Sequence, residues 1–188
     1  MPEPALSIAP ARPPSLRSSG RLGAVPVTGE TFVAIMASFP TGVAVVTTVD
    51  AAGNPYGLTS NAVSSVSAAP PQLLVCVAKT SRTFPTLVER SGFVVNFMGD
   101  GSEDVCALFA SKADPPEKFA TVPWHRTPGG LPHLHEHAIA FAECEVDQEI
   151  EAGTHVVFIA RVLDGAIAGD DRQPIAYVRR GYRSWPAG

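Results

Sequence analysis

Residues 138–167 read AIAFAECEVDQEIEAGTHVVFIARVLDGAI, and this stretch decides the fold. Its two halves, 138–151 and 154–167, have the apolar and β-branched content of long strands. A tight Glu-Ala-Gly connection joins them, and strands joined by so short a link pair antiparallel. The stretch therefore predicts a long β-hairpin.

The segments around this hairpin also have mostly β character. Residues 72–78 and 92–98 are nearly continuous apolar runs, which is typical of buried strands. Turn residues at 50–55 and the pair Pro70-Pro71 separate the runs. Besides the hairpin, the predicted strands are 43–49, 56–67, 72–78, 92–98 and 174–177.

A few short helices are expected between the strands. Thr28 is predicted to cap a helix that ends at Pro40 and gathers Phe32, Ile35, Met36 and Phe39 on one face. Ser81 is predicted to cap a second helix over 83–90, and Ser102 a third. Long antiparallel strands with few helices predict a mainly β fold, an antiparallel barrel decorated by short helices.

Composition excludes several classes of protein. Of the 188 residues, 45% are hydrophobic and 17% charged, which is incompatible with global disorder. No apolar run approaches the roughly 20 residues of a membrane helix, and no apolar stretch typical of a secretory signal follows the N-terminus. The net charge of −4 and the lack of a basic face argue against nucleic acid. We therefore expect a cytoplasmic, soluble protein.

The first 26 residues differ in composition from the rest. They hold six of the eighteen prolines and few large apolar residues, so they cannot bury enough surface to offset the cost of ordering. We expect residues 1–26 to form a flexible arm rich in Pro, Ser and Arg, with packing over a partner subunit as the alternative. Residues 27–188 are expected to form one domain.

Two groups of reactive side chains point to no site. His133, His135 and His137 alternate at strand spacing, but no acidic or sulfur ligand is evidently paired with them, so no metal centre is expected. Cys76 and Cys144 lie in apolar strand patterns, where cysteine is usually a small buried hydrophobe. Neither a Rossmann glycine motif nor a P-loop occurs.

Two polar segments are better candidates for binding a ligand. Residues 57–67, GLTSNAVSSVS, offer hydroxyls, an amide and backbone groups that can bond the rim of a flat heterocycle. Residues 79–83, KTSRT, gather cations and hydroxyls at a strand-to-helix junction, which suits a phosphate. A polar edge strand followed by an ordinary helix cap is the alternative interpretation.

Several linked segments resemble the flavin reductase-like proteins, which have the FMN-binding split-barrel fold, antiparallel and Greek-key-like. The segments are FPTGVAVVTT at 39–48, GLTSN at 57–61 with SVS at 65–67, FVVN at 93–96, EKF at 117–119, and GTH at 153–155 before an apolar strand. Each is short, but their order and spacing match the family over nearly the whole domain.

The resemblance implies a flavin pocket and, beside it, a nicotinamide site. The isoalloxazine rim would be bonded by Thr59, Ser60, Asn61 and Ala62, and the ribityl chain would be lined by Cys76, Val77 and Ala78. The phosphate would be held by Ser81, Arg82 and Thr83. The pocket would be closed, from this or a neighbouring subunit, by Phe109 and Phe119. The nicotinamide residues would be Pro40, Thr41, Gly57, His155 and Tyr182. His155 would be the catalytic residue, and no metal is implied.

Three positions depart from the pattern of the family. Ala62 stands where many relatives have serine, and Thr154 replaces the aspartate usual before the histidine. In the C-terminal segment 177–182, YVRRGY, the glycine is displaced from its usual position in the family. The assignment of Tyr182 to the nicotinamide depends on how this segment is aligned.

The function implied by the resemblance is that of an NAD(P)H:flavin oxidoreductase. It would reduce FMN or FAD by hydride transfer from NADH or NADPH and supply the reduced flavin to a partner monooxygenase, acting as a homodimer. One alternative is a flavin-binding module or chaperone without NAD(P)H turnover. An oxidase resembling the pyridoxamine phosphate oxidases is a second, which fits worse because no second cationic cluster is found.

Overall fold

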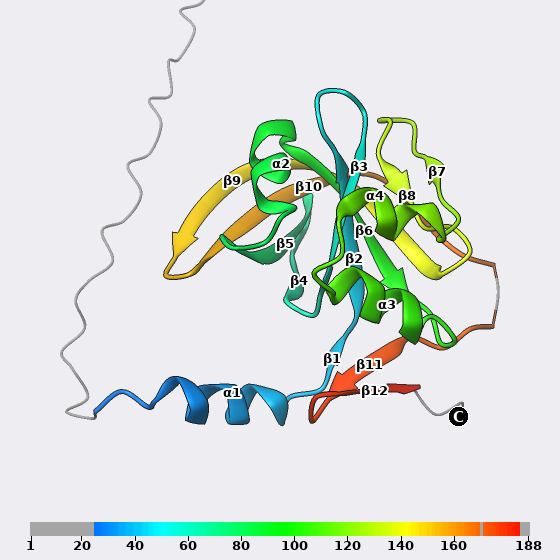
Figure 1. Ribbon diagram of the computed structural model, residues 1–188. Coiled ribbons are helices and arrows are strands. Elements are labelled where there is room, and N and C mark those ends of the chain that lie inside the picture. The colour runs from blue at the N-terminus through cyan, green and yellow to red at the C-terminus, as the bar shows by residue number, and fades with distance from the viewer. Residues whose placement is uncertain (1–24, 170, 185–188) are drawn as a thin grey trace, which may run out of the picture.

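The computed structural model describes residues 25–169 and 171–184. All but the last two residues of the predicted N-terminal arm lie outside this described part. A seven-stranded sheet forms the body of the molecule, in the order β3-β2-β6-β9-β10-β5-β4 (Figure 1). Its strands are β2 (Ala44–Val49), β3 (Pro55–Ser60), β4 (Val63–Ala68), β5 (Pro71–Ala78), β6 (Gly92–Met98), β9 (Ala138–Ala152) and β10 (His155–Ile167).

The predicted long hairpin is confirmed. Strands β9 and β10 pair antiparallel from His155 opposite Ala152 to Ile167 opposite Ala140, with two irregularities in register. Gly153 takes a φ of +60° in the connecting turn, a conformation that glycine adopts without steric cost. Both strands are long and curved, and they carry β6 on one side and β5 on the other (Figure 1).

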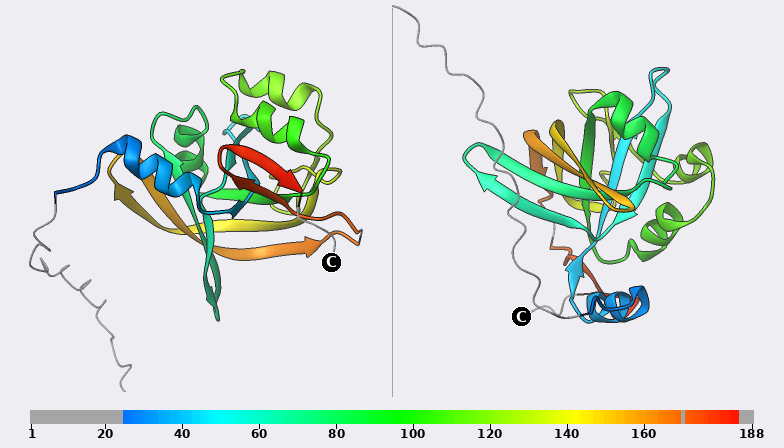
Figure 2. Two further views of the ribbon diagram at one scale, coloured as in Figure 1. Left: turned by 90° about the horizontal axis from the view of Figure 1, so that it is seen from below. Right: turned by 90° about the vertical axis from the view of Figure 1, so that its left-hand side faces the viewer.

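The sheet curves strongly but does not close (Figure 2). Within the described residues, β3 pairs with β2 and β4 pairs with β5, so β3 and β4 form the two edges. Residues 56–67, predicted as one extended segment, form two strands, because the chain bends at the exposed Asn61. The predicted class, a mainly β antiparallel split barrel, is confirmed.

Side chains cover both faces of β2, which explains why its sequence is a continuous apolar run. Ala44 and Val46 belong to a core cluster with Phe93 and Phe158. Val45 faces the opposite way, into a second cluster with buried residues of α3 and α4.

The described residues form four helices: α1 (Gly29–Ala37), α2 (Phe84–Arg90), α3 (Glu103–Ala110) and α4 (Pro115–Ala120). Thr28 caps α1 as predicted, since its Oγ1 accepts a hydrogen bond from the N–H of Thr31 at 3.2 Å. Thr83 is the N-cap of α2 in place of the predicted Ser81. Ser102 is the N-cap of α3 as predicted, but its hydroxyl bonds the ring of His137 instead of the helix backbone.

The sequence did not indicate α4 or the second of two C-terminal strands. Strands β1 (Thr41–Gly42), β11 (Ile175–Val178) and β12 (Gly181–Ser184) form a small sheet, and β7 (His125–Arg126) pairs with β8 (Pro132–His133). Arg179 and Arg180 form the β11–β12 turn with positive φ values of 50° and 61°. Glycine and asparagine are the residues that predict such a turn, so the two arginines did not indicate it. Among the described helices, none is long and apolar enough to cross a membrane.

Candidate flavin-binding site

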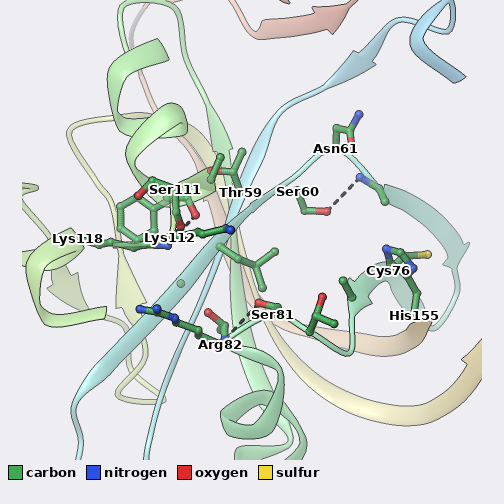
Figure 3. Close-up of a pocket in the computed structure, with 18 residues that line it drawn as sticks. Thr59, Ser60, Asn61, Cys76, Ser81, Arg82, Ser111, Lys112, Lys118 and His155 are labelled. Atoms are coloured by element: carbon green, nitrogen blue, oxygen red, sulfur yellow. Dashed lines mark hydrogen bonds between the residues drawn. The ribbon is translucent and has the colours of Figure 1, made fainter. Parts of the chain in front are cut away.

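A pocket of about 470 Å³ lies where β3, β5 and the start of β10 meet the N-terminal side of α2 and the α3–α4 region (Figure 3). It brings together most of the predicted flavin residues. The pocket is lined by Gly57, Leu58, Thr59, Ser60, Asn61, Ala62, Cys76, Ala78, Thr80, Ser81, Arg82, Thr83, Phe109, Ala110, Ser111, Lys112, Lys118 and His155.

The β3–β4 bend forms a polar rim whose two hydroxyls bond to the protein itself. The Oγ1 of Thr59 donates to the carbonyl of Cys106 at 2.6 Å, and the Oγ of Ser60 accepts from the N–H of Ala62 at 3.1 Å. The carbonyl of Ala62 in turn accepts from the N–H of Cys76 at 3.0 Å. These bonds fix the backbone of the bend, so its remaining polar groups are held ready for a ligand.

Three cations, Arg82, Lys112 and Lys118, lie on one side of the pocket, opposite Asn61, Cys76 and His155 (Figure 3). Arg82 precedes α2, and its guanidinium donates to the carboxylate of Asp114 in an ion pair between two exposed side chains. Ser81 stiffens this junction, because its Oγ accepts from the N–H of Thr83 at 3.2 Å. The three cations give this end of the pocket the chemistry that suits an anion.

Lys118, on α4, is buried beside this cationic end. Its Nζ donates to the carbonyls of Phe109 and Ser111, each at 3.0 Å, and among the described residues no carboxylate forms an ion pair with it. Burial lowers the pKa of Lys118, and the charge of Arg82 lowers it further. An anion placed between the two cations would relieve both costs.

Sequence reasoning did not single out Lys118. It stands in the EKF motif at 117–119, but its burial depends on α4, which the sequence did not predict. The proline pair at 115–116, at the start of this helix, was the available signal.

Two aromatic rings form the wall behind the rim. Phe109 lines the pocket, and Phe119 packs edge-on against it with ring centroids 5.0 Å apart. Phe119 is therefore part of the support of the wall. Val77, predicted to line the ribityl chain, points into the core of the barrel and is 1% exposed.

The predicted nicotinamide residues are not brought together. Gly57 and His155 line the pocket, whereas Pro40 and Thr41 line another pocket next to β11. Tyr182 packs against Tyr177, with ring centroids 5.3 Å apart, and is absent from the lining of the first pocket. The exposed His155 has its Nδ1 2.9 Å from the Oγ1 of Thr154, so the hydroxyl partners the imidazole.

The histidines of the 133–137 segment lie elsewhere. His133 and His125 face each other across β7 and β8, with Nδ1 and Nε2 3.2 Å apart, and the ring of His135 lies 4.5 Å from that of His125. His137 instead bonds Ser102. Over residues 25–169 and 171–184, no group of three His, Cys, Asp or Glu side chains is arranged to hold a metal ion.

Comparisons with known proteins identify the family of the chain. Residues 36–186 match the family model of the flavin reductase like domain. The flavin reductase (NADH) of Kitasatospora aureofaciens is 43% identical over 161 residues, which cover 85% of this chain and 83% of that protein.

Two solved structures share the fold. The NADH:FAD oxidoreductase SgcE6 of Streptomyces globisporus, in complex with NAD and FAD fragments, superposes with a TM-score of 0.77 at 29% identity, over 87% of this chain and 98% of that one. BorF, the flavin reductase component of a bacterial two-component tryptophan halogenase, has a TM-score of 0.78 at 29% identity and matches 86% of this chain and 100% of its own. The chain belongs to the flavin reductase-like family.

Proposed function

We propose that this protein is an NADH:flavin oxidoreductase that reduces FMN or FAD. The observation that carries the proposal is the buried Lys118 beside Arg82 at one end of a pocket whose other end is a polar rim. Relatives that bear the names of NADH-dependent flavin reductases support NADH as the donor.

The residues of the pocket fit a flavin nucleotide. Arg82, Lys112 and Lys118 would hold the phosphate, since a largely buried ammonium without a carboxylate partner is stabilised by an anion beside it. Thr59 to Ala62 would bond the edge of the ring system through the backbone of the β3–β4 bend. Phe109 would cover an apolar part of the ligand.

The bound flavin supplies the chemistry, which is acceptance of a hydride from the nicotinamide. The role of the chain is to hold the two rings in contact and in the correct orientation. His155 lies at the opposite side of the pocket from the cations, where it would bond the nicotinamide amide (Figure 3). Thr154, bonded to Nδ1, would fix the orientation of the imidazole.

We also propose that the reduced flavin leaves the protein for a partner oxygenase in the cytoplasm. BorF is the reductase component of a two-component system, which supports this role. A homodimer is part of the proposal.

Initial rates of NADH and NADPH oxidation with FMN, FAD and riboflavin test the proposal, with bound flavin measured by absorbance. We expect NADH oxidation that depends on added flavin. Flavin binding without NADH oxidation would favour the alternative, a flavin-binding module or chaperone. No flavin binding at all would refute both.

A further inference from the structure

Asp114 places a carboxylate next to Arg82, at the end of the pocket that is proposed to bind an anion. Among the described ion pairs it is the acidic partner of Arg82, whereas neither Lys112 nor Lys118 has a carboxylate partner there. Two lysines are thus left for an incoming anion, and the third cation is already neutralised.

Asp114 is also the N-cap residue of α4, a position where an aspartate usually bonds the helix backbone. Its side chain makes no capping bond and accepts from the Nη1 of Arg82 instead. The carboxylate therefore occupies one of the guanidinium N–H donors with which Arg82 could bind an anion.

We propose that Asp114 competes with the phosphate of the flavin for Arg82 and so weakens the binding of phosphate-bearing flavins. This inference rests on the proposed function. A carboxylate and a phosphate require the same planar fork of N–H donors. Near one another they also repel, so binding must displace Asp114 from Arg82 or leave two anions side by side.

The consequence is a flavin that binds and leaves readily. Because both partners are more than half exposed, the pair is weak, and its competition changes the affinity by a modest factor. We expect removal of the carboxylate to tighten FMN binding about 3- to 10-fold. Riboflavin has no phosphate, so its affinity should not change.

The experiment measures dissociation constants of FMN and riboflavin by fluorescence titration of wild type and Asp114→Asn. Asparagine keeps the size of the side chain and is an equally good N-cap residue. Asp114→Ser, which also favours the N-cap, is a second variant should the first fail to fold. Glu117→Gln is the matched control, because it removes one exposed negative charge from the same helix.

Tighter FMN binding in Asp114→Asn, with riboflavin and the Glu117→Gln control unchanged, supports the inference. In an Arg82→Ala background the same substitution should have no effect on FMN. Equal or weaker FMN binding in folded Asp114→Asn overturns it. A wild-type protein that binds no flavin would refute the proposed function, whereas an unchanged FMN-to-riboflavin ratio refutes the inference alone.

Discussion

At the scale of single residues, Lys118 distinguishes a phosphate site from an ordinary polar pocket. We expect Lys118→Met to weaken FMN binding about 10- to 100-fold, the scale of one lost charge-assisted hydrogen bond in a buried site. Riboflavin binding should fall much less. Titration of both flavins by fluorescence quenching measures the difference.

The control is Lys112→Met, because Lys112 lines the same pocket but is exposed. Its effect on FMN should be smaller than that of Lys118→Met. Since Lys118 also bonds two carbonyls at the C-terminal end of α3, circular dichroism must show that the variant is folded. Equal losses for FMN and riboflavin would make Lys118 a purely structural residue.

His155 is predicted to act on the nicotinamide. We expect His155→Ala to slow flavin reduction or to raise the KM for NADH about 10- to 100-fold, as for one or two lost hydrogen bonds. FMN affinity should change little. Stopped-flow bleaching of saturating flavin measures the step, with Thr154→Ala as a milder control. A wild-type rate with unchanged NADH dependence would contradict the assignment.

His133 makes stability depend on pH. Burial lowers its pKa to about 4, and the charges of His125 and His135 contribute in the same direction. Between the unfolded value of about 6.5 and this folded value, the unfolded chain binds more protons, so the free energy of unfolding falls as the pH falls. The contribution is complete above pH 6.5 and is lost toward pH 4.

We expect a loss of about 1–2 kcal/mol from this group between pH 7.5 and pH 5. Urea unfolding of wild type and His133→Gln at both pH values measures it, and the variant should lose less stability on acidification. Because the pKa of His137 is also lowered, part of the pH dependence should remain in the variant. Identical slopes for the two proteins would rule out His133 as the cause.

At the scale of elements, Gly57 sets how closely β3 approaches α3 and α4. A Cβ at this position would lie 2.7 Å and 2.9 Å from ring atoms of Phe109 and 3.3 Å from Phe119. Gly57→Ala should therefore destabilise the protein by about 1–3 kcal/mol, the usual cost of overpacking, and weaken FMN binding. Thermal unfolding measures the first effect.

The matched control is Gly42→Ala on β1, where a Cβ would meet nothing within 4 Å. Its unfolding temperature should stay close to that of wild type. A Gly57→Ala protein as stable as Gly42→Ala would show that the two rings move aside at little cost.

Elements whose signal lies in their own residues could be predicted from the sequence. The β9–β10 hairpin follows from the two strand-like segments joined by the tight turn at Gly153, and the pocket of the candidate site is lined mostly by two contiguous segments, 57–62 and 76–83. Elements defined by tertiary packing could not. The turn at Arg179 and Arg180 lacks glycine, and the burial of Lys118 depends on α4 packing under β3.

The nicotinamide residues show the same limit. The resemblance to the family indicated His155, and this residue lies in the pocket. Pro40, Thr41 and Tyr182 come from the β1–β11–β12 sheet and the chain leading into it, away from this pocket. The sequence carries no direct signal of how that small sheet sits relative to the barrel.

At the scale of the whole molecule, α1 lies apart from the barrel, beside β11 and β12 (Figures 1 and 2). The helix has no buried residue, and the apolar side chains on it and just after it are about half exposed: Phe32, Val33, Ile35 and Met36 on the helix, and Phe39 after it. A continuous apolar surface of this kind is typical of a protein interface. A second copy of the chain is the partner that the proposed homodimer requires.

We therefore expect the protein to be a dimer that α1 holds together, and Ile35→Glu to give monomers in analytical ultracentrifugation. Glu30→Gln, on the same helix, is the control and should remain dimeric. Asn61 lines both the flavin pocket and a hollow of about 330 Å³ beside α1. Loss of the dimer should therefore free the β3–β4 bend and weaken FMN binding as well. A dimeric Ile35→Glu protein would place the interface elsewhere. A wild-type protein that is monomeric and binds flavin with full affinity would show that α1 forms no such interface.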